Sequence, residues 1–163
     1  MILALGGNLA GSFASQEALF DAVLSRAPCA GLRVVKKSSW WRSAAWPDPR
    51  TPDYLNGVLI VETTLPPLEV LGVALKLEAE FGRARSQVNA PRTLDIDLVA
   101  YGRRTISSSE LILPHPRAHE RYFVMGPLAE IAPDWRHPVL DLTARDLAAA
   151  APVGRDARPL EEG

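Results

Sequence analysis

The sequence predicts an α+β fold that forms one domain, and three observations support this. Apolar and polar residues alternate in 94–98, and residues 54–64 also read as a strand, rich in β-branched residues. Apolar residues recur at helical spacing after Ser15 and after the proline pair Pro66-Pro67. The 163 residues are 47% hydrophobic and 23% charged, which suits one domain with a substantial core.

In chain order the main segments alternate as strand, helix, strand, strand, helix and strand. Residues 2–5 are a short apolar run ended by a glycine pair, as in a buried strand and turn. Ser15 can cap the first helix, and Gly82 can end the second. The expected strands are 2–5, 32–42, 54–64 and 94–101, and the expected helices are 15–27 and 66–82.

The last third of the chain has weaker signals. We expect a short strand at 110–113, an apolar segment at 123–128 and a final helix over 142–151. The end, from Pro152 to Gly163, is expected to fray. No linker divides the chain, so residues 1–163 are expected to form one domain. The element order is that of the ferredoxin-like sandwich, an antiparallel sheet with helices on one face and the other face open.

The most informative stretch is 78–97, which combines three arginines with two closely spaced aspartates. Residues two apart in a strand share a face, so Asp95 and Asp97 are expected together, opposite the apolar residues between them. Two adjacent carboxylates repel unless a cation lies between them, and Mg²⁺ commonly takes one or two. Arginines suit phosphate oxygens. The stretch therefore suggests a site for a nucleotide phosphate and a metal ion.

Plainer explanations remain open at this point. An Asp-x-Asp pair is often the solvated face of a half-covered sheet, and nearby arginines can serve in salt bridges. Trp46 lies in a proline-rich loop, where it can either fold onto the core or act as a lid over a ligand.

Composition narrows the function classes. The net charge of −1 gives no general attraction to nucleic acid or anionic membranes. The single cysteine, Cys29, excludes an intrachain disulfide. No apolar run reaches the ~20 residues of a membrane span, and no signal peptide is evident. We therefore expect a cytoplasmic protein. Apart from composition, we expect a monomer that acts on small molecules.

Five motifs resemble one family. They are ALGGNL near the start, PDYLN at 52–56, LEAEFGRAR at 77–85, PRTLDIDLVAYG at 91–102 and LILPHPRAHERYFVMGPLAEIAP at 111–133. In this order they resemble the 6-hydroxymethyl-7,8-dihydropterin pyrophosphokinases of folate synthesis. The resemblance implies a ferredoxin-like fold with three mobile loops over the open face. It also implies transfer of the β,γ-diphosphate of ATP to the pterin hydroxymethyl group, releasing AMP.

The resemblance also implies residue roles. The matching positions comprise Asp95 and Asp97 for two Mg²⁺ ions and Arg83 and Arg92 as catalytic arginines. Those around ATP are Glu78, Arg85, Leu98, His115 and Arg121. Those around the pterin are Ser43, Ala44, Trp46, Tyr54, Asn56 and Phe123, with Tyr54 and Phe123 stacking on the ring and Asn56 reading its edge.

Two departures from the family pattern stand out. Asn89 occupies the position of a common loop tryptophan, and Ser43-Ala44 replaces a common Thr-Pro. Trp46 is a candidate to supply the missing aromatic cover. A ferredoxin-like module that binds RNA or a small regulator without catalysis is the alternative. This sequence lacks the aromatic motif expected of such an RNA-binding sheet, and the alternative leaves the arginines and aspartates unexplained.

Overall fold

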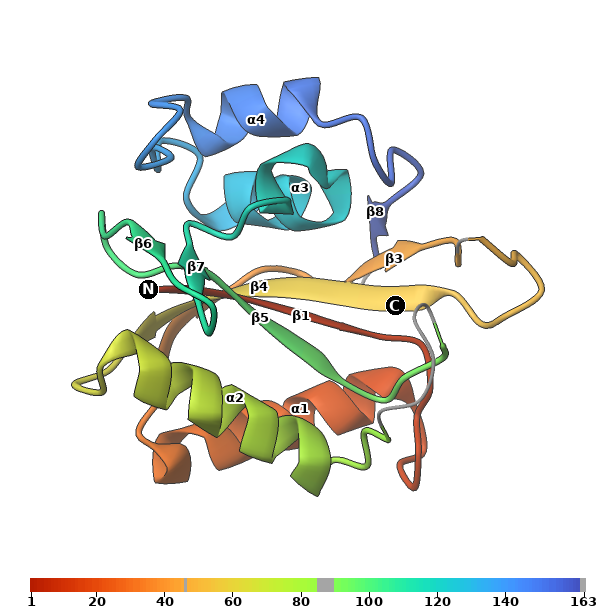
Figure 1. Cartoon of the computed structure of the whole chain (residues 1–163). Coiled ribbons are helices and arrows are strands. Elements are labelled where there is room, and N and C mark those ends of the chain that lie inside the picture. Colours follow the sequence, from red (N-terminus) through yellow and green to blue (C-terminus); the bar gives the residue numbers. More distant parts are fainter. Residues whose placement is uncertain (46, 85–89, 162–163) are drawn as a thin grey trace.

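A six-stranded antiparallel sheet separates two layers of helices (Figure 1). The computed structural model describes residues 1–45, 47–84 and 90–161. The strand order is β5-β1-β4-β3-β8, with β2 also paired to β4. The strands are β1 (Ile2–Gly7), β2 (Arg33–Lys37), β3 (Trp41–Ser43), β4 (Tyr54–Glu62), β5 (Asp95–Ala100) and β8 (Arg158–Pro159).

One face of the sheet packs against α1 (Gln16–Arg26) and α2 (Pro67–Glu80). The Ser15 hydroxyl accepts a hydrogen bond from the Ala18 amide at 3.1 Å and caps α1, as predicted. Pro67 opens α2, and Gly82, at φ +87°, follows its end.

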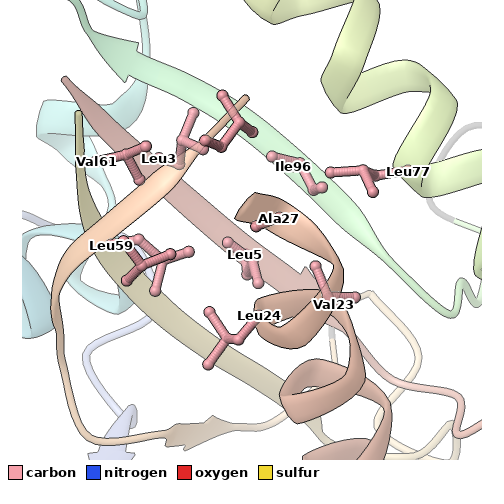
Figure 2. Close-up of a pocket in the computed structure, with 11 residues that line it drawn as sticks. Leu3, Leu5, Val23, Leu24, Ala27, Leu59, Val61, Leu77 and Ile96 are labelled. Carbon is pink, nitrogen blue, oxygen red and sulfur yellow. The ribbon is translucent and has the colours of Figure 1, made fainter. Parts of the chain in front are cut away.

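The core beneath these helices is closely packed. Figure 2 shows leucine, valine and isoleucine side chains of β1, β4, β5, α1 and α2 converging on a small apolar cavity. Its volume is about 10 Å³. A cavity that size and without polar walls holds no ligand.

The opposite face carries the second pair of helices, α3 (Tyr122–Ile131) and α4 (Ala144–Ala150). Val124, Met125 and Leu128 of α3 are buried against Ile2 and Val58 of the sheet. The expectation of helices on one face only is therefore wrong. The apolar segment 123–128 was recognised in the sequence, but it continues as a helix that must bury its apolar side against the sheet.

A tryptophan fixes α3 to the sheet edge. A Cβ at Gly126 would lie 2.8 Å from the Trp41 ring, so only glycine allows this approach. The Trp41 indole N–H donates to Glu130 Oε2 at 2.9 Å, and the Ser39 amide donates to Oε1 at 2.7 Å. Polar and apolar contacts together hold α3 against β3.

The strand expected over 54–64 is β4, and its side chains alternate between the two faces of the sheet. Leu55, Leu59 and Val61 lie in the core with α1 and α2, whereas Val58 and Ile60 lie in the core with α3 and α4. The pairing of β4 with β1 fits this alternation, because Gly6 pairs with Asn56 on one face and Leu5 pairs with Gly57 on the other.

Three segments differ from their sequence-based expectations. Residues 32–42 form two strands, β2 and β3, with a break at 38–40. In this break the Ser38 hydroxyl accepts a hydrogen bond from the Val58 amide of β4. The strand expected at 110–113 is shorter; it is β7 (Ile112–Leu113), and it pairs with β6 (Ile106–Ser107). Two short 3-10 helices, η1 (Ala27–Ala30) and η2 (Ala118–Glu120), complete the elements. The end was expected to fray, but Arg158 and Pro159 pair with β3.

Among the described residues, no helix combines the length and the apolar character needed to cross a bilayer.

Candidate active site

Asp95 and Asp97 lie on the same face of β5, as predicted. Ile96 and Leu98 are buried with α1 and α2, so the two aspartates point to the other side of the sheet. Their side chains are 29% and 35% exposed, so both carboxylates reach solvent. The two carboxylates therefore share one face of the sheet, and both are partly exposed.

Two arginines hold Asp95. Arg83 Nη1 donates to Asp95 Oδ1 at 2.8 Å, and Arg92 Nη1 donates to Oδ2 at 3.0 Å. Both guanidinium groups come from the chain that joins α2 to β5, and each is about one-fifth exposed. Guanidinium groups of this kind can also donate to an anion that reaches this end of the sheet.

Glu78, on the last turn of α2, lies behind this cluster. Its carboxylate is buried; Oε1 accepts from the Ile96 amide at 2.8 Å, and Oε2 forms an ion pair with Arg83 at 2.5 Å. Burial raises the pKa of Glu78, against the opposing effects of the Ile96 amide and Arg83. In this arrangement Glu78 orients Arg83 and ties α2 to β5.

His115 and Arg121 flank Asp97. The distances to Asp97 Oδ2 are 3.9 Å from His115 Nε2 and 3.7 Å from Arg121 Nη1. Burial and the charge of Asp95 raise the pKa of Asp97. Burial, together with Arg121, lowers the pKa of His115 despite the attraction of Asp97. A carboxylate with a raised pKa is one that an added cation would stabilise.

The predicted pterin-side residue Asn56 lies on the same face of the sheet as the aspartates, on the other side of β1. Asn56 and Asp95 both pair with Gly6, so two strand spacings of ~4.8 Å separate them by roughly 10 Å. The buried Asn56 Nδ2 donates to Ser43 Oγ at 3.0 Å. Tyr54 is half-buried on the same face of β4.

Phe123 lies on the first turn of α3, the helix that packs on this face of the sheet. Its ring is half-buried, and the Arg121 guanidinium lies 6.0 Å from the ring centroid. Ala44 is exposed at the end of β3. Trp46, Arg85 and Asn89 lie outside the described residues.

An open pocket of about 280 Å³ adjoins Asp97 and His115 along the free edge of β5. Apolar side chains of Leu71, Leu98 and Leu111 line it, together with the polar segment 108–110. Such a mixture of apolar walls and a few polar groups is typical of small-molecule sites.

Sequence reasoning missed the role of Asn8. Its buried side chain accepts from the Arg92 amide at 2.9 Å and donates to the Pro52 carbonyl at 3.2 Å. Asn8 thus joins the end of β1 to the arginine segment and to the loop before β4. The sequence signals were its position after the glycine pair, which also reads as an ordinary turn, and its place in the ALGGNL motif.

Among residues 1–45, 47–84 and 90–161, no group of three or more His, Cys, Asp or Glu residues could enclose a metal. A cation here would be held by the two aspartates and completed by oxygens of a ligand and water. That donor set fits Mg²⁺, which keeps several non-protein ligands.

Comparison with known proteins identifies the family. The sequence pattern of the family described as 7,8-dihydro-6-hydroxymethylpterin-pyrophosphokinase (HPPK) matches residues 2–133. The chain belongs to this family.

Two relatives within the HPPK family illustrate the similarity. The 2-amino-4-hydroxy-6-hydroxymethyldihydropteridine pyrophosphokinase of Synechocystis is 43% identical over 137 residues, covering 84% of this chain and 68% of the relative. The protein of the same name from Methylorubrum extorquens is 41% identical over 132 residues, covering 81% and 82%.

Solved HPPK-containing structures share the fold. The Plasmodium falciparum HPPK-DHPS structure superposes with a TM-score of 0.67 at 15% identity and covers 91% of this chain. This chain spans 42% of that longer protein, so the likeness speaks for the architecture alone. This HPPK family member and its structural neighbours therefore share an architecture of helices packed on an antiparallel sheet.

Proposed function

We propose that this protein transfers the β,γ-diphosphate of ATP to the hydroxymethyl group of 6-hydroxymethyl-7,8-dihydropterin in folate biosynthesis, giving the pterin diphosphate and AMP. The observation that carries the proposal is the row of groups along one sheet face. Two carboxylates and two guanidinium groups lie at one end, and the buried Asn56 lies roughly 10 Å away across β1. That spacing separates a polyphosphate region from a ring-recognition region. Family membership supports the same assignment.

At the acidic end, Asp95 and Asp97 would hold two Mg²⁺ ions, which neutralise polyphosphate charge when bound. Arg83 and Arg92 are the catalytic arginines of this proposal. Their guanidinium groups exchange the Asp95 carboxylate for phosphate oxygens and stabilise the charge that develops during transfer. No residue has to act as a strong base, because positioning and electrostatics dominate phosphoryl transfer.

The ATP molecule would run from these arginines toward the pocket beside β5. Leu98 lines that pocket, and His115 borders it next to Asp97. Arg121 adds a third cation on the Asp97 side. Glu78 acts through Arg83, and Arg85, which lies outside the described residues, is retained as an ATP contact on sequence grounds alone.

The pterin would lie against Asn56. The amide of Asn56 can exchange hydrogen bonds with the ring edge, and Ser43 orients it. Tyr54 and Phe123 are the proposed stacking residues. Ser43, Ala44 and Trp46 complete the proposed pterin side; Trp46 lies outside the described residues.

The finer expectations also enter as proposals. The strand order supports a ferredoxin-like sandwich in which β5, β1, β4 and the β2–β3 pair form the sheet, with α3 and α4 added to the second face. One domain over 1–163, a cytoplasmic monomer, and small-molecule substrates without nucleic acid complete the proposal. Coverage of the second sheet face by α3 disfavours an RNA platform there.

The test is a reaction of purified protein with ATP, Mg²⁺ and hydroxymethyldihydropterin, with nucleotides separated by chromatography. We expect AMP to form only when the pterin is present. The Asp97→Ala variant should lose this activity, and Lys76→Ala, on the exposed side of α2, is the control that should retain it. Release of ADP, or AMP formation independent of pterin, would contradict the assignment.

A further inference from the structure

Residues 153–160, here called the C-terminal strap, pass two elements that carry or adjoin proposed pterin contacts, α3 and β3. The strap lies outside residues 2–133, which the family pattern matches. It follows α4 and ends as β8, next to β3 (Figure 1).

The strap first holds the start of α3. The Tyr122 amide donates to the Val153 carbonyl at 2.8 Å, and the Val153 amide donates to the Glu120 carbonyl at 3.0 Å. At Gly154, whose φ is +72°, a Cβ would lie 2.4 Å from Phe123 Cδ1. The Gly154 backbone therefore packs directly on the Phe123 ring and sets its position.

The strap then holds β3 and the residues after it. Arg158 pairs with Arg42 and Pro159 with Trp41, and the Leu160 amide donates to the Trp40 carbonyl at 2.7 Å. The Ala44 amide donates to Asp156 Oδ2 at 2.6 Å. Because the acceptor is ionised, this is a short, charge-assisted hydrogen bond.

The Asp156 contact reaches the ring-recognition residues within two steps. Ala44 follows Ser43, and Ser43 Oγ accepts from Asn56 Nδ2. Ala44 and Asp156 are both exposed, so water would satisfy the Ala44 amide if the carboxylate were removed. The contact consequently adds little to global stability, but it fixes where the chain leaves β3.

We propose that the C-terminal strap positions the pterin side of the site, and that Asp156 is a positioning residue that fixes Ser43 and Ala44. The inference rests on the proposed function. The strap holds Phe123 from one side and the Ser43–Asn56 pair from the other, so the gap between them depends on it. The Val153 end of the strap also pairs with Arg121 of the ATP side. Asp156 lies at the other end, on the Ala44 amide, so a change at Asp156 probes the pterin side.

The test compares KM values for the two substrates. Asp156→Ala should raise the KM for the pterin by about 3- to 10-fold, which corresponds to the loss of one hydrogen bond. The KM for ATP should stay unchanged, and the melting temperature should stay within about 2 °C. Asp156→Asn keeps an acceptor oxygen and should restore most of the affinity for the pterin. Asp134→Ala removes a 90% exposed carboxylate whose cation lies 3.9 Å away and is the matched control, with both KM values unchanged.

The outcomes separate the two proposals. Wild-type protein that forms AMP with the pterin, together with an Asp156→Ala variant of unchanged pterin KM, would overturn the positioning role alone. An equal rise in both KM values, or no recovery in Asp156→Asn, would also overturn it. Wild-type protein without pterin-dependent AMP formation would overturn the proposed function and this inference with it.

Discussion

Gly7 is the position at which one methyl group should do the most damage to the site. A Cβ there would lie 2.3 Å from the Thr93 carbonyl oxygen and 3.3 Å from that of Arg92. Both atoms are backbone, so no side chain can turn aside to make room. We therefore expect Gly7→Ala to push the segment that carries Arg92 away from β1.

The magnitude follows from the contacts that this movement breaks. The Asn8 and Leu9 amides donate to the Arg92 carbonyl at 2.9 and 3.1 Å. Overpacking costs about 1–3 kcal/mol, and losing each hydrogen bond costs about 0.5–1.5 kcal/mol more. The free energy of unfolding should fall by about 2–6 kcal/mol, which lowers the melting temperature by about 5–20 °C in a chain of this size.

Thermal unfolding followed by circular dichroism measures this effect, and the AMP assay measures its consequence for Arg92. Gly6→Ala is the stability control, because its nearest atom, Asn56 Oδ1, lies 3.7 Å from the added Cβ. A melting temperature for Gly7→Ala within 1 °C of wild type, or an equal loss in Gly6→Ala, would refute the reasoning.

Three further predictions follow from single residues. Gly72→Ala on α2, where nothing lies within 4 Å of an added Cβ, should raise the free energy of unfolding by about 0.5–1 kcal/mol; a loss of stability in urea titration would contradict it. Asp97→Asn should raise the melting temperature at pH 7 while reducing turnover at least about 100-fold, because burial and Asp95 raise the pKa of Asp97 and make its ionised form costly in the folded state. A melting temperature below that of wild type would count against this view. Glu130→Ala should cost about 1–3 kcal/mol at pH 7, since Ser39 and Trp41 donate to its carboxylate. Burial raises the pKa of Glu130, but the hydrogen bonds from Ser39 and Trp41 outweigh burial, so the net pKa is lowered. The stabilisation by Glu130 is therefore present at neutral pH and should disappear as the pH falls through this lowered pKa. Equal losses of stability at neutral and acidic pH would argue against this explanation.

The sequence predicted best where one face of an element is buried. In β5, the apolar Ile96 and Leu98 require that Asp95 and Asp97 point the other way, so local alternation determines the acidic pair. The Ser15 cap and the proline start of α2 were likewise local and correct. Such features depend on neighbours in the chain, which a sequence displays directly.

The sequence predicted poorly where distant segments meet. The coverage of the second face by α3 depends on Trp41 fitting against Gly126, 85 positions later, and no periodicity reports that fit. The Asn8 contacts reach Arg92 and Pro52 across 84 and 44 positions. The same holds for the pairing of β8 with β3, which a proline-rich, charged segment gave no reason to expect.

The close contact of the Trp41 ring with Gly126 also limits how this protein can adapt to what it binds. Trp41 belongs to the sheet and Gly126 to α3, and the indole N–H to Glu130 fastens the same two parts a second time. Sheet and helix therefore shift as a single block, and the backbone of α3 keeps a set distance from β3. Any tightening around a substrate must come from the connecting loops, whose rearrangement leaves this block undisturbed.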